Sequence, residues 1–519
     1  MPNCTRIGVN PSSYYAGHAQ LFEALACVFD VRFEPAQDPG DPQWDAVIIN
    51  GRAVTSAPQD KPSFVLAPGD ALPCANAPVK FGFSTSVPNT FRGAHLNDPS
   101  LQSVVRLAID GSSEVLAHCG GYPIWLRVRE RPETHVSALE LPKMEGGDAH
   151  KPVLWDHFQL KKWAALLFLL HWLKKLARAD WLLPEARALI IVDDPNLQAT
   201  SYGYLNYEEL VADARRNNYH AAIATIPLDS WHTNRKAVEV FRRNTDRLSL
   251  AIHGNNHTRA ELARTQDRHA AFAIVSQALR RIASFERRTG LEVSRVMVAP
   301  HGACNTTTGA AMLTAGFESA CISIGSLAYW NPDVKWTPAL GLWMAHPLGG
   351  LPVFHRVGLV EIALQARIML FLGQAAVFAT HHADFDTFRT IANTVNSVGS
   401  VRWLSATEIS RSNYHRRETR TGLEIEAFGR IITVPVGPSL ESITIRVPWI
   451  GECHCQADWQ GSLGRRTSAR DTNIRIDLTS EADADFAEMS TGKNPSILTP
   501  LARRLMCQMR DRMMPLVHQ

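Results

Sequence analysis

The stretch ARALIIVDDP, residues 186–195, predicts the fold of the region around it. Its apolar run is typical of a buried strand in a parallel sheet. The run ends in Asp193 and Asp194, and Pro195 disfavours the helical conformation for the residue before it. We therefore expect Asp194 to stay extended where the strand leaves the sheet.

Short apolar runs alternate with helical segments after this stretch. Strands are expected over 220–227, 248–254, 294–302, 317–324 and 375–385, and the helices between them include a long one over about 259–289. The alternation indicates five to seven strand–helix units in about 230 residues, which is typical of a closed or nearly closed β/α barrel. We place this barrel at residues 185–412.

Polar side chains follow these strands at the points where they end. Asp193 and Asp194 follow one strand, and His253 and His257 follow another within the segment LSLAIHGNNH. Residues 258–261, Thr-Arg-Ala-Glu, fit a capping box, which predicts that the next helix begins near residue 258 and that His257 lies in the turn before it. Since β/α barrels place active sites at this edge of the sheet, we expect the four side chains to lie close together.

A carboxylate and two imidazoles are enough for a catalytic zinc site. Three protein ligands leave one coordination position for water, and the metal lowers the pKa of that water toward about 7. A second carboxylate beside the ligand can act as the general base. Because successive side chains of an extended strand face opposite ways, we expect Asp193 and Asp194 to divide these two roles.

Two further strand ends carry candidate residues. The segment VAPHG contains Pro300 and His301, and the segment FATHHADF contains His381 and His382. A histidine at such a place can protonate a leaving group, because its pKa lies nearest neutrality. Each motif alone also fits a polar turn or a surface loop. Their occurrence after several apolar strands of one region favours the metal site.

The order of these motifs resembles the polysaccharide deacetylases, carbohydrate esterase family four and its relatives, over about residues 185–405. The resemblance implies a distorted β/α barrel of about seven strands. It also implies a metal-dependent hydrolase that removes an N-acetyl or O-acetyl group from a glycan. The implied metal ligands are Asp194, His253 and His257, and the metal is zinc or another divalent transition metal.

The same resemblance assigns the remaining roles. Asp193 is expected to be the catalytic base, and His381 the catalytic acid, with His382 as the alternative. Pro300 and His301 are expected to contact the substrate. The implied reaction starts with attack of water on the acetyl carbonyl and ends with protonation of the departing group.

The sequence departs from the family pattern at two positions. Pro195 stands where the first motif usually ends in glycine, so the chain resembles a divergent branch whose first motif is Asp-Asp-Pro. Val298 stands where the third motif normally has an arginine that orients the base. Arg295 or another group is expected to take the place of that arginine.

The segments on either side of the barrel have different patterns. Residues 1–150 alternate strands and helices, which predicts a flavodoxin-like or glutamine-amidotransferase-like α/β domain, with Cys119 structural rather than nucleophilic. A linker helix is expected within 151–184. Residues 413–519 are expected to form a β-rich domain with a C-terminal helix. No site is assigned to the Cys-His-Cys segment at 453–455.

The composition excludes several classes of function. A net charge of +3 is too small for a nucleic-acid surface, and nine irregularly spaced cysteines favour reduced thiols in a cytoplasm. The N-terminus has no signal-peptide pattern, so a cytoplasmic location is expected. The apolar run that begins at Trp163 is too short to span a bilayer, and we expect a helix that packs on its own protein or docks on a membrane surface.

Three functions follow from these observations. The first is the hydrolase of an acetylated glycan or sugar-containing precursor, and the second is a metal-dependent hydrolase of another C–N bond, such as that of a cyclic amide. The third is a non-catalytic carbohydrate-binding or scaffold protein with a degenerate barrel, which the missing arginine of the third motif favours. The sequence does not indicate the oligomeric state.

Overall fold

The structure is a computed structural model that describes residues 4–74, 77–144, 153–159, 162–381, 384–420, 422–436, 442–448 and 472–478. The chain forms two compact units, Met1–Trp181 with Lys335–Trp343, and Leu182–Val334 with Met344–Gln519. The short segment Lys335–Trp343 is held in the first unit by a hydrogen bond from the Leu154 N–H to the Pro338 carbonyl (2.9 Å). Because compact units need not coincide with domains, the domain boundaries given above stay a prediction.

The first unit contains a mixed sheet with the strand order β2-β1-β3-β4-β11-β10-β9-β6-β7. The strands from β2 to β11 in this order run parallel, and the rest run antiparallel. The chain leaves β1 toward β2 on one side and returns to β3 on the other. The bounds are β1 (Thr5–Asn10), β2 (Val31–Pro35), β3 (Ala46–Asn50), β4 (Ser63–Leu66), β6 (Val79–Phe81), β7 (His95–Leu96), β9 (Ser113–Cys119), β10 (Tyr122–Val128) and β11 (Thr134–Ser137).

The first unit also contains three α-helices and a strand pair. They are α1 (Ser12–Gly17), α2 (Ala19–Phe29), α3 (Trp163–Ala177) and the pair β5 (Ala71–Pro73) with β8 (Ser103–Val105). Helix α3 contacts α2 and β11, and its apolar residues from Trp163 to Leu173 are buried. The rings of Trp125 and Phe168 stack at 4.4 Å. Each leucine buried in this way stabilises the fold by about 1.5–3 kcal/mol, which explains why the apolar run packs on its own protein.

No helix in the described part of the chain is long and apolar enough to cross a membrane.

The second unit is built on seven parallel strands in the order β20-β18-β17-β16-β15-β12-β21, with β19 antiparallel beside β20 and β22 beside β12. Their bounds are β12 (Arg187–Asp193), β15 (Ala221–Thr225), β16 (Leu248–Ile252), β17 (Ser294–Val298), β18 (Ser319–Ile322), β19 (Ala345–Leu348), β20 (Leu351–His355), β21 (Ala376–Thr380) and β22 (Arg402–Trp403). The seven parallel strands of this run are almost wholly buried, as expected for a parallel sheet covered by helices.

Backbone hydrogen bonds link the two ends of this run of strands. The Val357 N–H, just beyond β20, donates to the Val377 carbonyl, and the Ala379 N–H donates to the Val357 carbonyl (both 2.9 Å). Val357 thereby forms a parallel bridge with Phe378 of β21. The first and last parallel strands are therefore neighbours in space.

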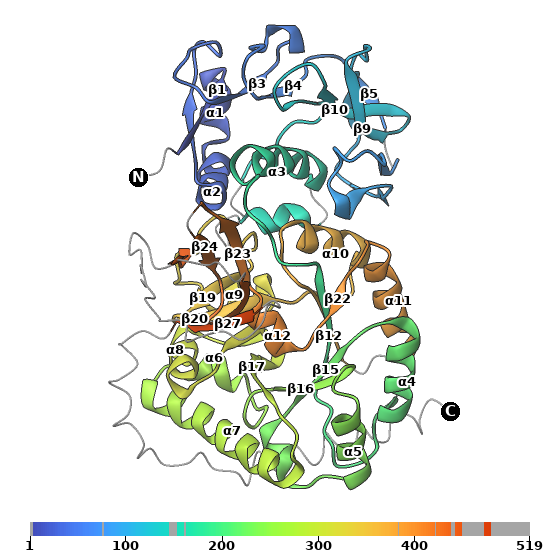
Figure 1. Cartoon of the computed structure of the whole chain (residues 1–519), viewed down its shortest axis with the longest axis vertical. Helices are drawn as coiled ribbons and strands as arrows, with labels where there is room; N and C mark the ends of the chain where they lie inside the picture. The colour runs from blue at the N-terminus through green and yellow to red at the C-terminus, as the bar shows by residue number, and fades with distance from the viewer. Residues whose placement is uncertain are drawn as a thin grey trace. The chain divides into compact units, whose positions relative to one another are not determined.

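Helices connect successive strands of the second unit. They are α4 (Tyr207–Asn217), α5 (Arg235–Arg243), α6 (Glu261–Arg264), α7 (Arg268–Thr289), α8 (Thr306–Ala315), α9 (Ile324–Trp330), α10 (Ile362–Phe371), α11 (Phe385–Asn396) and α12 (Ala406–Arg411). Figure 1 shows α4, α5, α7 and α11 on the outside of this unit, around β12 and β15–β17. The single helix expected over 259–289 is wrong. The helix is interrupted between α6 and α7, because the Asp267 side chain accepts a hydrogen bond from the Ala270 N–H and caps a new helix.

A small β-structure follows the parallel strands within the second unit. Strands β23 (Tyr414–Glu418), β24 (Gly422–Ala427) and β26 (Ser442–Arg446) form one sheet, and β25 (Ile431–Val436) pairs with β27 (Thr472–Asp477). Apolar side chains that include Ile425, Ile432 and Ile445 form its core. The C-terminal helix expected for the tail and the segment 453–455 lie outside the described residues.

Candidate metal centre

The two aspartates at the end of β12 lie in different environments. Asp193 is the last residue of the strand, and Asp194 follows it with a φ of 85° and 4% exposure. The expected extended conformation of Asp194 is therefore wrong. A proline disfavours the right-handed helical region for the residue before it, but aspartate also tolerates positive φ. This turn in the backbone directs the Asp194 carboxylate toward the histidines that follow β16.

The carboxylate of Asp194 lies within reach of two imidazoles. Its Oδ1 atom is 3.5 Å from the Nε2 of His253 and 3.2 Å from the Nε2 of His257. One ligand atom from each of the three side chains lies within 4.8 Å of the other two. Ligand atoms about 2.0–2.2 Å from a tetrahedral ion lie roughly 3.3–3.5 Å apart, so the spacing around Asp194 fits a zinc-sized ion.

The hydrogen bonds of His253 favour the tautomer that a metal needs. Its Nδ1 atom lies 2.8 Å from the carbonyl oxygen of Val298. A carbonyl only accepts, so Nδ1 carries the hydrogen, and the lone pair of the neutral ring is on Nε2, which faces Asp194. Val298 occupies the position at which an arginine was expected, and its backbone orients one of the candidate ligands.

The pKa of the Asp194 carboxyl is held well below its usual range. Burial alone would raise this pKa, but hydrogen bonds from His253 and His381 and the positive charge of His253 and His257, in the protonated forms that these rings take without a metal, outweigh burial. Asp194 is therefore ionised under ordinary conditions, as a metal ligand must be. A carboxylate with two imidazoles is also one of the three-ligand sets that catalytic zinc sites use.

The loop between the two histidines is held by the carboxylate of Glu261. Its Oε1 atom accepts hydrogen bonds from the N–H groups of residues 255, 256 and 257, each at 2.8 Å. The helix expected to begin near Thr258 begins at Glu261 instead. The glutamate of the expected capping box does bind backward, but it binds the loop of His257, and this fixes the second imidazole.

A glycine and an arginine complete the support of this loop. Gly254 has a φ of 69°, and a Cβ atom there would lie 2.7 Å from the Pro300 Cγ, so no other residue fits without rearrangement. Arg281 on α7 donates to the side-chain oxygens of Asn255 (2.6 Å) and Asn256 (2.7 Å). The ligand loop is therefore anchored to a helix by charged groups rather than left to solvent.

Asp193 is bound by an arginine that the sequence analysis did not identify. The Nη1 atom of Arg356, at the end of β20, donates to both carboxylate oxygens of Asp193 at 2.8 and 2.9 Å. Its Nη2 donates to the Ala299 carbonyl at 3.2 Å. Arg356 is only 8% exposed. Burial works to lower the pKa of its guanidinium, but the charge of Asp193 outweighs burial and raises that pKa.

The other candidate for this role lies elsewhere. Arg295 donates to the carboxylate of Glu286 at 2.9 and 2.8 Å. It precedes β17's carboxyl end by several residues and therefore lies away from the strand ends. A signal for Arg356 was present in the sequence, since the segment LPVFHR places a histidine and then an arginine after an apolar run, much as polar residues follow the other strands.

His381 is the third imidazole at Asp194. It follows β21, and its Nε2 lies 2.8 Å from the Asp194 Oδ2. The side chain is 49% exposed, in contrast to the buried His253. His382, the alternative acid, lies outside the described residues.

Pro300 and His301 lie in the turn after β17. Pro300 is buried against Gly254, and His301 is exposed with a φ of 57°. The ring of His301 lies 4.9 Å from that of His257, centroid to centroid. Burial lowers the pKa of His301, and so does the charge that His253 carries when it is protonated. His301 therefore lies beside the candidate ligands but is open to solvent.

No protein-family model matches the sequence, and no curated protein matches it. Similar solved structures include a family 4 carbohydrate esterase from Streptomyces lividans in complex with acetate, at 13% identity and a TM-score of 0.27, over 43% of this chain and 94% of that one.

A polysaccharide deacetylase from Bacillus cereus is 11% identical with a TM-score of 0.25, over 43% of this chain and 92% of that one. A CE4 esterase from Streptococcus mutans is 15% identical with a TM-score of 0.26, over 43% of this chain and 86% of that one. At these TM-scores the likeness carries no weight for the fold or function of this chain.

Proposed function

We propose that this chain is a metal-dependent hydrolase that removes acetyl groups from an N-acetylated or O-acetylated carbohydrate. The observation that carries the proposal is the cluster of Asp194, His253 and His257, with Asp193 and Arg356 beside it. The order of motifs that resembles the polysaccharide deacetylases supports the reaction and the substrate class. The fold we propose for the second unit is a distorted β/α barrel, which the seven parallel strands and the bridge at Val357 support.

The residues that would hold the metal are Asp194, His253 and His257. A zinc ion there supplies Lewis-acid polarisation of a carbonyl oxygen and makes hydroxide available near neutral pH. The ionised carboxylate and the Nε2 lone pair of His253 meet the requirement that ligands be deprotonated.

Asp193 is the general base in this proposal. As water attacks the acetyl carbonyl carbon, the Asp193 carboxylate takes a proton from that water. The two bonds from Arg356 leave other lone pairs of the carboxylate free to accept, and they fix its orientation. Arg356 acts through Asp193 and is therefore a positioning residue.

His381 is the general acid. The bond from the acetyl carbon to the sugar nitrogen or oxygen breaks, and His381 gives a proton to the departing amine or alcohol while acetate leaves. Its ring is half-exposed and is therefore accessible to a substrate. His301, exposed beside His257, and Pro300 are placed to contact the substrate.

The non-catalytic alternative was favoured by the arginine missing from the third motif. Arg356 makes the contact with the base that this arginine would make, so that reason no longer applies. No feature of the described site favours a cyclic amide over an acetylated sugar.

The test is acetate release by the purified full chain from acetylated sugar oligomers, with the metal content measured on the same sample. We expect about one zinc per chain, loss of activity on chelation, and recovery on addition of zinc. Acetate release that persists after the metal is removed contradicts the proposal. Ring-opened product from cyclic amides without acetate release would assign the site to the other C–N hydrolase.

A further inference from the structure

The first unit contains a large pocket whose residues the proposed reaction does not use. Its volume is about 1280 Å³, and every residue that lines it belongs to this unit. This volume exceeds the roughly 300–1,000 Å³ of most small-molecule sites. There is therefore room for a ligand of more than one ring.

The pocket lies where parallel α/β sheets bind ligands. Ser13 and Tyr14 follow β1, Asn50 ends β3, and Glu140 follows β11. The chain moves to one side of β1 to form β2 and to the other side to form β3. Such a reversal opens a crevice at the carboxyl ends of the strands, and this crevice is the usual binding place in open α/β sheets.

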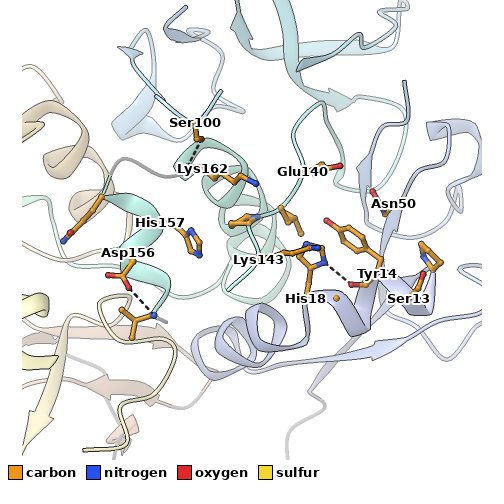
Figure 2. A pocket seen from close by; sticks show the side chains of 16 residues that line it. Ser13, Tyr14, His18, Asn50, Ser100, Glu140, Lys143, Asp156, His157 and Lys162 are labelled. Carbon is orange, nitrogen blue, oxygen red and sulfur yellow. Dashed lines mark hydrogen bonds between the residues drawn. The ribbon is translucent and has the colours of Figure 1, made fainter. Parts of the chain in front are cut away.

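The charged groups of the pocket cancel one another. It is lined by two lysines, Lys143 and Lys162, and by two carboxylates, Glu140 and Asp156, so the formal charge is zero with the histidines neutral. Figure 2 shows these four side chains spread around the pocket, and the Asp156 carboxylate accepts from the Val153 N–H at 3.5 Å. A charge-balanced wall gives no preference for an anion or a cation.

The uncharged groups supply both donors and acceptors. Asn50 brings an amide, and Ser13 brings a hydroxyl. The Nδ1 of His18 lies 3.1 Å from the Tyr14 carbonyl and so donates to it, which leaves Nε2 as an acceptor in the neutral ring. The rings of Tyr14 and His18 lie 4.2 Å apart and add an apolar surface. Mixed donors and acceptors around a ring surface match a molecule with many hydroxyl groups.

We propose that this pocket is a binding site for a neutral saccharide, separate from the candidate metal centre. Lys143 and Lys162 donate to sugar hydroxyls, Glu140 accepts from them, and Tyr14 contacts a ring face. The inference rests on the pocket alone and does not depend on the reaction proposed for the second unit.

The test uses sugars without acetyl groups, so that hydrolysis plays no part. Binding of cellotriose and maltotriose to the full chain is measured by titration calorimetry, beside inorganic phosphate and glucuronate. We expect at least one neutral trisaccharide to bind at millimolar or lower concentration. Lys143→Met and Lys162→Met should each weaken this binding roughly 2- to 10-fold, as expected for one lost hydrogen bond.

Lys80→Met is the matched control, because Lys80 lies exposed on β6 of the same unit and does not line the pocket. Thermal unfolding checks that each variant is folded. If Lys162→Met does not fold, Lys143→Met still tests the proposal, because Lys143 is exposed in a loop. Binding of phosphate or glucuronate alone, equal binding by all three variants, or binding of no probe at millimolar concentration each overturns the proposal. The acetate assay decides the function of the second unit separately.

Discussion

The carboxyl ends of the parallel strands carry polar side chains in both units. The two units differ in how firmly those side chains are held by hydrogen bonds and burial. In the second unit Asp194 is buried among imidazoles, and Arg356 binds Asp193 through two hydrogen bonds. In the first unit the lysines and Glu140 are exposed around a wide pocket.

The difference indicates what each edge is suited to do. Chemistry requires groups held in place before the substrate arrives, because reorganisation during the reaction costs rate. Binding of a hydroxylated ligand tolerates side chains that adjust. We therefore expect substitutions at the strand ends of the second unit to affect the reaction rate strongly. Substitutions at the strand ends of the first unit should affect ligand affinity moderately.

The largest effect is expected from removal of a candidate metal ligand. His253→Ala should lose the zinc and lower the acetate-release rate by about 10³- to 10⁴-fold, since the metal supplies several kcal/mol of transition-state stabilisation. Metal analysis and kinetics on the same sample check this. His269→Ala, an exposed histidine on α7, is the control and should keep both zinc and activity. Full activity in His253→Ala would contradict the assignment of the reaction to the strand ends of the second unit.

Loss of the base should affect the rate but not the metal. Asp193→Asn is expected to lower kcat by about 10²- to 10³-fold, because an amide cannot take a proton from water. Zinc content should stay that of the unchanged protein, because Asp194 and the two imidazoles remain. If Asp193→Asn loses zinc and Asp194→Asn keeps it, the two aspartates have the opposite roles.

The ion pair between Arg356 and the base Asp193 should contribute both to the free energy of unfolding and to kcat. Arg356→Met leaves the largely buried Asp193 carboxylate, whose side chain is 15% exposed, without its partner, and we expect it to lower the free energy of unfolding by about 3 kcal/mol and kcat about 10- to 100-fold. Denaturant unfolding and steady-state kinetics measure the two effects. In the double variant with Asp193→Asn much of the stability should return, since no unpaired charge remains.

Arg295→Met is the matched control for Arg356, because Arg295 pairs with the partly exposed Glu286. It should change stability by less than about 1 kcal/mol and leave kcat unchanged. Equal effects of the two substitutions would show that Arg356 has no special relation to the base.

The smallest effect is expected from the support of the ligand loop. Glu261→Gln replaces the charged acceptor of three backbone N–H groups with a neutral one, and should weaken zinc binding about 10- to 100-fold while the chain stays folded. Competition with a chelator measures the affinity. Unchanged zinc affinity would mean that the loop keeps its shape without this charge.

Much of the second unit could be predicted from local sequence. The apolar strands, the helices between them and the position of Asp193, Asp194, His253 and His257 at strand ends follow from periodicity, because each strand is buried on both faces. The carboxyl ends of parallel strands lie at the same end of the sheet, and residues distant in sequence are therefore brought together there. The same reasoning, applied to the segment before Arg356, would have identified the partner of Asp193.

Local conformation could not be predicted in the same way. The positive φ of Asp194 and the start of α6 at Glu261 depend on hydrogen bonds with Ala224 and with residues 255–257, which no periodicity encodes. The excursion of 335–343 into the first unit is a long-range contact without a local signal. The pocket of the first unit was also missed, because its residues are scattered between Pro11 and Lys162.

The most direct measurement is zinc X-ray absorption on the purified full chain. We predict an ion with two imidazole nitrogens and a carboxylate oxygen at about 2.0–2.2 Å, with the imidazole signal reduced in both His253→Ala and His257→Ala. Sulfur ligands at about 2.3 Å, or a spectrum that neither substitution changes, would contradict it.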